Sequence, residues 1–105
     1  MSTARVLGID HGEARIGLAL SDDLGMLAHP LETIHVRQVA DPMERIAEIV
    51  GARAIRVIVV GMPFRIDGSV GTAAEKVRKF IEKLRKRLPD CQFIEVDERL
   101  STVEA

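Results

Sequence analysis

The chain has 105 residues, 47% of them hydrophobic and 30% charged, which suffices for a single domain built around one core. The formal net charge of -1 excludes a general attraction to nucleic acid or anionic membrane, so polyanion binding needs a local cationic patch or metal ions. The single cysteine, Cys91, excludes an internal disulfide, and no hydrophobic run is long enough to span a bilayer. We therefore expect a cytoplasmic protein with no membrane partner.

The first stretch of the chain predicts two short strands joined by a tight turn. The hydrophobic run 5–9 leads to Asp10, and residues 11–14 form a polar connection of hairpin length. Residues 15–21 then alternate, with large aliphatic side chains on one face and Gly, Ala and Ser on the other. A carboxylate at the end of a buried strand is costly unless it is exposed, hydrogen-bonded or metal-bound. Asp10 is therefore the first candidate functional residue.

The next stretch predicts a third strand and a first helix. The strand is expected at Leu27–Val36, and the early Pro30 favours an edge position, where a missing N–H does no harm. The helix begins with Asp41 as its N-cap and Pro42 at its first position. Its hydrophobic residues recur at helical spacing, and Gly51 is expected to end it.

The second half of the chain alternates strand, helix and strand. The β-branched run Ile55–Val60 is hydrophobic on both faces, which predicts a central strand covered on two sides. A loop at Met62–Gly71 leads to a second helix with Thr72 as its N-cap, and a last strand is expected at Cys91–Val96. The hydrophobic positions of the second helix fall at helical spacing: Ala73, Val77, Phe80, Ile81, Leu84 and Leu88.

This order of elements predicts an α/β fold with a mixed sheet. Strands separated by helices pair in parallel through right-handed crossovers, and the first hairpin supplies an antiparallel edge. Ligands of such sheets bind beyond the carboxyl ends of the strands. If the first and last strands are parallel, Asp10 shares that edge with Asp97 and Glu98. Carboxylates suit Mg²⁺ or Mn²⁺, and a pair of such ions activates water at a scissile phosphate.

Each candidate also has a simpler structural interpretation. Asp10 could instead cap the turn through the amides of residues 11–14. Arg15 and Arg99 could bind a phosphate, or could form surface pairs with Glu13 and Glu98.

Two further features are ambiguous. His11 could shuttle protons, although histidines in turns are usually solvated. The lysines and arginines of the second helix could form a nucleic-acid footprint, or they could be a solvated face that complements the helix C-terminus.

Four segments of the chain resemble the YqgF/RuvX family of bacterial nucleases. They are LGIDHGEARIGLALSD, AHPLETI, VVGMPFRIDGSVG and VDERLSTVEA, and they occur in order along nearly the whole chain. The family belongs to the RNase H-like superfamily and is described as pre-16S rRNA processing enzymes and as Holliday junction resolvases. The resemblance implies a five-stranded mixed sheet in the order 3-2-1-4-5, with its first three strands antiparallel.

The resemblance also implies roles for individual residues. Asp10 matches the catalytic aspartate that ligates Mg²⁺ or Mn²⁺, Glu98 matches the second acidic ligand, and Asp97 is the less favoured choice for that role. Three residues of the same motif match positions that contact nucleic acid: Arg99, Ser101 and Thr102. The implied partner is a structured RNA precursor or a branched DNA.

The end of the sequence suggests a shortened domain. Members of the family continue into a C-terminal helix with a further catalytic aspartate, whereas residues 101–104 only have the spacing that begins a helix. We therefore expect residues 1–105 to be a single, C-terminally truncated nuclease domain. They should show little or no cleavage alone, while the full-length protein should cleave.

Two other functions remain open from the sequence. A strand–Asp-x-Gly–strand hairpin also begins the actin-like sugar kinases and ATPases, which would bind ATP but need two such domains. A non-catalytic nucleic-acid-binding domain would instead keep salt-dependent RNA binding in EDTA and in the variant Asp10→Asn.

Overall fold

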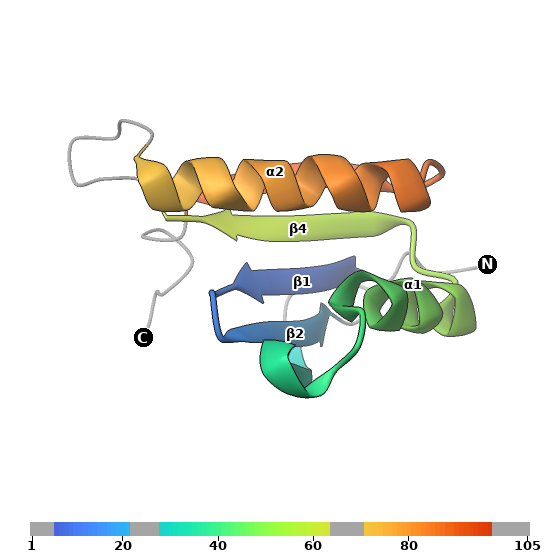
Figure 1. The fold of residues 1–105 in the computed structure, drawn as a ribbon. Helices are drawn as coiled ribbons and strands as arrows, with labels where there is room; N and C mark the ends of the chain where they lie inside the picture. Colours follow the sequence, from blue (N-terminus) through green and yellow to red (C-terminus); the bar gives the residue numbers. More distant parts are fainter. Residues whose placement is uncertain (1–5, 22–27, 64–70, 98–105) are drawn as a thin grey trace.

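A computed structural model describes residues 6–21, 28–63 and 71–97, and residues 1–5, 22–27, 64–70 and 98–105 lie outside the described part (Figure 1). Five strands form one sheet in the order β3-β2-β1-β4-β5. β1 to β3 are antiparallel neighbours, and β1, β4 and β5 are parallel, so the predicted α/β topology is confirmed. The elements are β1 (Val6–His11), β2 (Arg15–Ser21), β3 (Ala28–His35), η1 (Val36–Gln38), α1 (Pro42–Arg53), β4 (Val57–Met62), α2 (Thr72–Arg87) and β5 (Gln92–Asp97).

The alternation within the strands gives the sheet two different faces. Large aliphatic side chains of β1, β2 and β4, such as Leu7, Leu18 and Ile58, lie on one face and are buried in a single core. Both helices contribute to the same core, α1 through residues such as Ile46 and α2 through residues such as Leu84. The described residues therefore cover one face of the sheet with helices, and the face with the small residues is left open.

The β4 strand confirms one prediction and corrects another. It lies between β1 and β5 and is therefore central, as predicted, although it extends through Gly61 to Met62. Its expected cover on two sides is wrong for the described residues, because Val60 is fully buried whereas Val59 is only half-buried on the open face.

The start of α1 agrees with the sequence, but its end does not. Asp41 caps the helix by accepting a hydrogen bond from the Met43 N–H at 3.1 Å. Gly51 does not end it, because the helix continues to Arg53 and the left-handed residue is Ala54, with φ 55°. The Ile55 N–H donates to the Val50 carbonyl at 3.0 Å, and both side chains are buried. This hydrophobic contact fixes the helix end in a conformation that glycine would adopt more readily.

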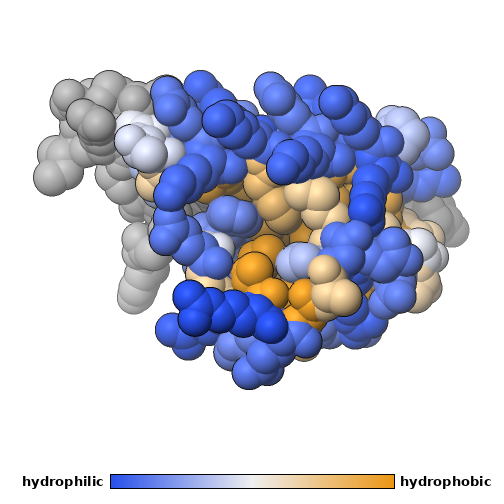
Figure 2. Space-filling view, viewed as in Figure 1, coloured by the Kyte–Doolittle hydropathy of each residue, from blue (hydrophilic) through white to orange (hydrophobic). Residues whose placement is uncertain are grey.

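α2 begins one position earlier than predicted. Gly71 is the N-cap, without a capping side chain, and Thr72 is the first helical residue. Ala74, not Ala73, is buried, because Val77, Ile81 and Leu84 set the centre of the hydrophobic stripe. Hydrophilic residues cover the outer side of α2, and hydrophobic residues are visible in the hollow beneath it (Figure 2). Neither α1 nor α2 is long and hydrophobic enough to cross a membrane.

The predicted edge position of β3 is confirmed, because it pairs only with β2 in the sheet order. Arg45 of α1 holds Glu32 of β3 through two hydrogen bonds of 2.6 and 2.9 Å. This bidentate pair holds the pKa of Glu32 below its usual value through the guanidinium hydrogen bonds. The edge strand is thereby joined to the helix layer as well as to β2.

Candidate functional site

Asp10 lies near the carboxyl end of β1, at the edge of the sheet where β4 and β5 also end. It is exposed, and its partner on β2 is Gly17. The two neighbouring parallel strands bring Gly61 and Val96 to the same end of the sheet. The prediction that this edge collects the first and last strands is thereby confirmed.

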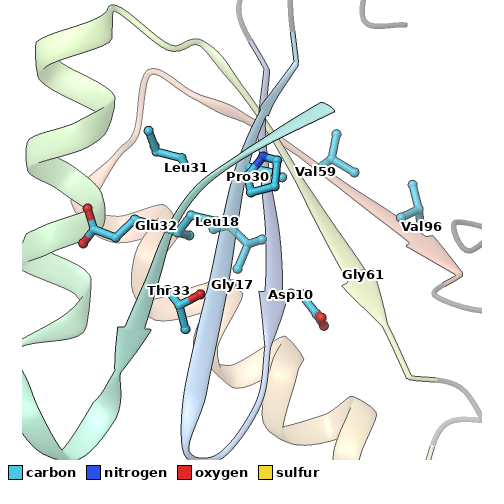
Figure 3. A pocket seen from close by; sticks show the side chains of 13 residues that line it. Asp10, Gly17, Leu18, Pro30, Leu31, Glu32, Thr33, Val59, Gly61 and Val96 are labelled. Atoms are coloured by element: carbon cyan, nitrogen blue, oxygen red, sulfur yellow. The ribbon is translucent and has the colours of Figure 1, made fainter. Parts of the chain in front are cut away.

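A pocket of about 810 Å³ lies on the open face of the sheet, and Asp10 lines it (Figure 3). Its floor contains the small residues Gly8, Gly17 and Gly61. A side chain at Gly17 would bring its Cβ within 3.7 Å of the Asp10 Cβ. The absence of side chains here leaves the Asp10 carboxylate open to a ligand from the uncovered side.

The Asp10 carboxylate has no hydrogen bond or ion pair to any described residue. The turn is closed instead by the Gly12 N–H, which donates to the Arg15 carbonyl at 2.8 Å. The interpretation of Asp10 as a turn cap is therefore wrong. An exposed carboxylate without an internal partner is available for a cation or a substrate.

The turn that follows Asp10 is tied to the start of α2. Lys76 of α2 forms an ion pair with Glu13, and the Lys76 hydrogen bond holds the pKa of Glu13 below its usual value. The expected pair between Glu13 and Arg15 is therefore wrong, because Glu13 already has a partner. A second hollow of about 360 Å³ lies between this turn and α2, and Asp10 lines it as well.

His11 is not a solvated turn histidine. It belongs to β1, is half-buried, and its ring lies 4.5 Å from the ring of Phe80 in α2, measured between centroids. Burial lowers the pKa of His11, and the nearby charge of Asp10 only partly offsets this effect. The neutral imidazole therefore acts as a packing surface between the first hairpin and α2.

Arg15 lies beside Asp10 on the same face of the sheet. It is exposed at the start of β2, two residues before Gly17, and it pairs across the strands with His35 of β3. It has no ion pair to a described carboxylate. Sequence reasoning identified Arg15 but missed His35, because the strand register that joins them is not visible in the sequence.

The second acidic motif is only partly described. Asp97 ends β5 beside the buried Met62, so it lies on the helix-covered face, opposite to Asp10. Glu98 and the predicted nucleic-acid contacts Arg99, Ser101 and Thr102 lie outside the described residues, so their positions remain predictions. Within the described part of the chain, no group of three or more His, Cys, Asp or Glu residues could hold a metal ion. Asp10 fits a hard divalent cation by its chemistry, but it needs carboxylates from outside that part.

The cations of α2 are partly neutralised by carboxylates of other elements. Arg78 pairs with Glu95 at 3.3 Å, and Arg87 pairs with Asp41 at 2.8 Å. Together with the Lys76 pair, these contacts favour the structural interpretation of this charged helix over a continuous nucleic-acid footprint.

Comparison with known sequences identifies close relatives of the chain. The RuvX family, described as Holliday junction resolvase, matches residues 4–105. A protein named "Putative pre-16S rRNA nuclease" from Acetivibrio thermocellus is 48% identical over 102 residues, which are 96% of this chain and 72% of the relative. A protein of the same name from Fusobacterium nucleatum is 48% identical over 101 residues, with the same coverage of 96% and 72%.

Solved structures share the fold at much lower identity. Archaeoglobus fulgidus Pelota matches with a TM-score of 0.61 and 12% identity, over 91% of this chain and 27% of Pelota. A "putative sugar kinase" from Cytophaga hutchinsonii matches with a TM-score of 0.55 and 14% identity, over 90% of this chain and 36% of that structure. These likenesses show the fold alone and do not support a kinase activity.

Proposed function

Because this chain belongs to the RuvX family, we propose that it is the core of a metal-dependent endonuclease that hydrolyses phosphodiester bonds in structured nucleic acid. The observation that carries this proposal is Asp10, an exposed carboxylate that has no partner among the described residues and lies at the edge where parallel strands end. Ligands of open α/β sheets bind at this edge. The names of the relatives support the reaction class, and the position of Asp10 supports this edge of the sheet as the place of the reaction.

We further propose that the substrate is the precursor of 16S rRNA, cut during maturation of its 5′ end in the cytoplasm. This choice follows the printed name shared by the relatives that are 48% identical to this chain. The family description favours a second candidate, a Holliday junction cut during DNA recombination or repair. Both substrates present phosphodiesters to the same edge of the sheet.

The proposed metal ligands are Asp10 and Glu98, with Mg²⁺ or Mn²⁺ as the bound ion. Asp10 is a hard oxygen donor that faces the open side, whereas Asp97 lies on the opposite face of the sheet. Asp97 is therefore the weaker choice for the second ligand. A bound divalent ion supplies an activated water and stabilises charge on the phosphate in such reactions.

The other residues of this edge would bind and orient the substrate. Arg15 carries a guanidinium on the Asp10 face and can hold a phosphate oxygen beside the scissile bond. Gly17 leaves room for the sugar-phosphate backbone to approach the sheet closely. We propose that Arg99, Ser101 and Thr102 add further contacts to the nucleic acid.

A cleavage assay with a matched control tests this proposal. Full-length protein that contains residues 1–105 is incubated with a 5′-extended 16S rRNA fragment and with a four-way DNA junction, in Mg²⁺ or EDTA. Asp10→Asn keeps the size of the side chain but removes its charge, so cleavage should fall about 100-fold or more. The control Asp90→Asn changes an exposed aspartate between α2 and β5, and it should cleave like the wild type.

The same assay separates the alternative functions. Cleavage of the RNA alone identifies the rRNA precursor as the substrate class, and cleavage of the junction alone identifies branched DNA. Undiminished cleavage by Asp10→Asn would contradict the proposed site. Salt-dependent binding without cleavage in any metal would instead identify a non-catalytic nucleic-acid-binding protein.

A further inference from the structure

A third hollow lies beside the turn between β1 and β2, where the turn meets the end of β3 and the start of η1. Its volume is about 430 Å³. The Val36 N–H donates to the Ala14 carbonyl at 3.0 Å, which joins the end of β3 to the turn. Backbone hydrogen bonds thus hold two sides of the hollow in place. It is lined by Ala14, Arg15, His35, Arg37 and Gln38.

The hollow is cationic and uncompensated. It contains two guanidinium groups, those of Arg15 and Arg37, and no carboxylate of the described residues lines it. Neither arginine has an ion pair or a hydrogen bond to a described residue, whereas Arg45 and Arg87 on the helices each pair with carboxylates. Two guanidiniums around one hollow repel each other, and a shared anion relieves that repulsion. The guanidinium fork matches the oxygens of a phosphate.

One wall of the hollow comes from the same face of the sheet as Asp10. Asp10 is opposite Gly17 on β2, and Arg15 is two positions along the same strand, so both side chains project from the same face. Diagonal neighbours of this kind are about 7–8 Å apart between Cα atoms. His35 extends the row from Arg15 onto β3. A strand that places one phosphate at Asp10 can therefore reach the hollow with a neighbouring phosphate.

We propose that this hollow, formed by Arg15, His35, Arg37 and Gln38, binds a non-scissile phosphate of the nucleic-acid strand that is cut at Asp10. The inference deepens the proposed function and rests on it. A polynucleotide fits better than a free anion, because the four side chains are exposed and two of them, Arg15 and His35, lie on the same uncovered face of the sheet as Asp10. Arg37 and Gln38 thereby become substrate-binding residues that neither motif nor spacing indicates.

Equilibrium binding in EDTA tests the hollow without any cleavage. The probes are a fluorescein-labelled four-way DNA junction and a labelled 5′-extended 16S rRNA fragment, each titrated at several salt concentrations. Arg37→Ala should raise the Kd about tenfold, which corresponds to the loss of one charged hydrogen bond. It should also reduce the slope of log K against log salt by about 0.7–0.9, as expected for one lost phosphate contact. Arg37→Lys keeps the positive charge, so its slope of log K against log salt should be close to that of the wild type.

The matched control is Arg56→Ala. Arg56 is exposed like Arg37 and carries the same charge, but it precedes β4 at the opposite end of the sheet from Asp10. This variant should keep the wild-type Kd and salt slope. Circular dichroism checks that both variants fold, and folding is expected because neither side chain is buried or forms an ion pair with another described residue.

Two results would overturn the inference. One is an Arg37→Ala protein whose Kd and salt slope equal those of Arg56→Ala. The other is a titration with inorganic phosphate in which the amide resonances of Arg15 and Arg37 shift, while Arg37→Ala leaves nucleic-acid binding unchanged. That second result would mark the hollow as a site for free anions.

The binding experiment and the cleavage experiment test the two proposals independently. If Asp10→Asn cleaves like the wild type while Arg37→Ala binds weakly, phosphate binding in the hollow is supported and the proposed catalytic site is contradicted. If Arg37→Ala binds normally while Asp10→Asn is inactive, the proposed catalytic site is supported and phosphate binding in the hollow is contradicted. Weaker binding by Arg37→Ala together with inactive Asp10→Asn supports both.

Discussion

At the scale of single residues, glycines show how differently the same residue type can be constrained. Gly12 lies in the turn after Asp10, and a Cβ there would come within 2.8 Å of the Arg15 backbone oxygen. Gly51 lies inside α1, and a Cβ there would meet nothing within 4 Å. The first glycine is required by the turn that carries the site, and the second is not required by any contact.

This contrast predicts opposite effects of the same substitution. Gly12→Ala should lower the free energy of unfolding by about 1–3 kcal/mol, because the turn must shift to remove a backbone clash. Gly51→Ala should raise it by about 0.5–1 kcal/mol, because alanine is the better helix former at an exposed helical position. Urea unfolding of the two variants measures both changes. Equal effects of the two substitutions would contradict the role assigned to Gly12.

At the scale of elements, the contact between α2 and the first hairpin fixes the surroundings of Asp10. Lys76 of α2 pairs with Glu13, and Phe80 of the same helix packs against His11. Both contacts reach the segment that directly follows Asp10. Because exposed ion pairs contribute little to stability, the packing of His11 against Phe80 carries most of this contact.

The packing of His11 makes stability depend on pH. Its folded pKa is lowered by burial, so the folded protein binds fewer protons than the unfolded chain near the ordinary histidine pKa of about 6.5. The stabilisation is fully present above that value and is lost as the pH falls through 6.5 towards the lower folded pKa. Thermal melts between pH 7.5 and 5.5 should therefore show a smaller decrease in Tm for His11→Gln than for the wild type.

The control for this prediction is His29→Gln, which changes an exposed histidine of β3. It should keep the pH dependence of the wild-type Tm. A pH dependence that is the same in all three proteins would show that His11 does not couple protonation to folding.

At the scale of the whole molecule, the sequence patterns predict the order of the elements and a mixed sheet, and the family resemblance implies the strand order that the structure has. Alternation in β2, the β-branched run of β4 and the helical spacing in α2 each identify one type of element, and few topologies join them. The sequence wrongly predicts that α1 ends at Gly51, because the end of this helix depends on burial of Val50 and Ile55 in the core. The sequence also wrongly predicts Thr72 as the N-cap of α2, because Gly71 takes that position without a capping side chain.

The candidate site could be predicted only in part, for a related physical reason. A carboxylate at a strand end is visible in the sequence, so Asp10 was identified. The pairing of Arg15 with His35, and the ion pair of Glu13 with Lys76, depend on strand register and helix docking. These long-range contacts are set by the packing of the sheet, and local patterns carry no signal for them. The sequence predicts the correct edge of the sheet for Asp97. The face of the sheet on which Asp97 lies depends on its register with Met62, which the sequence does not reveal.

The central claim is that Asp10 holds a catalytic divalent ion at the open end of the sheet, and Mn²⁺ titration followed by NMR tests it most directly. Substoichiometric Mn²⁺ should selectively broaden the amide resonances around Asp10 and at Asp97–Glu98, because paramagnetic broadening falls steeply with distance. The same titration of Asp10→Asn should lose this pattern, while Asp90→Asn should keep it. Broadening that is absent, or that is located elsewhere and unchanged in Asp10→Asn, would contradict the claim.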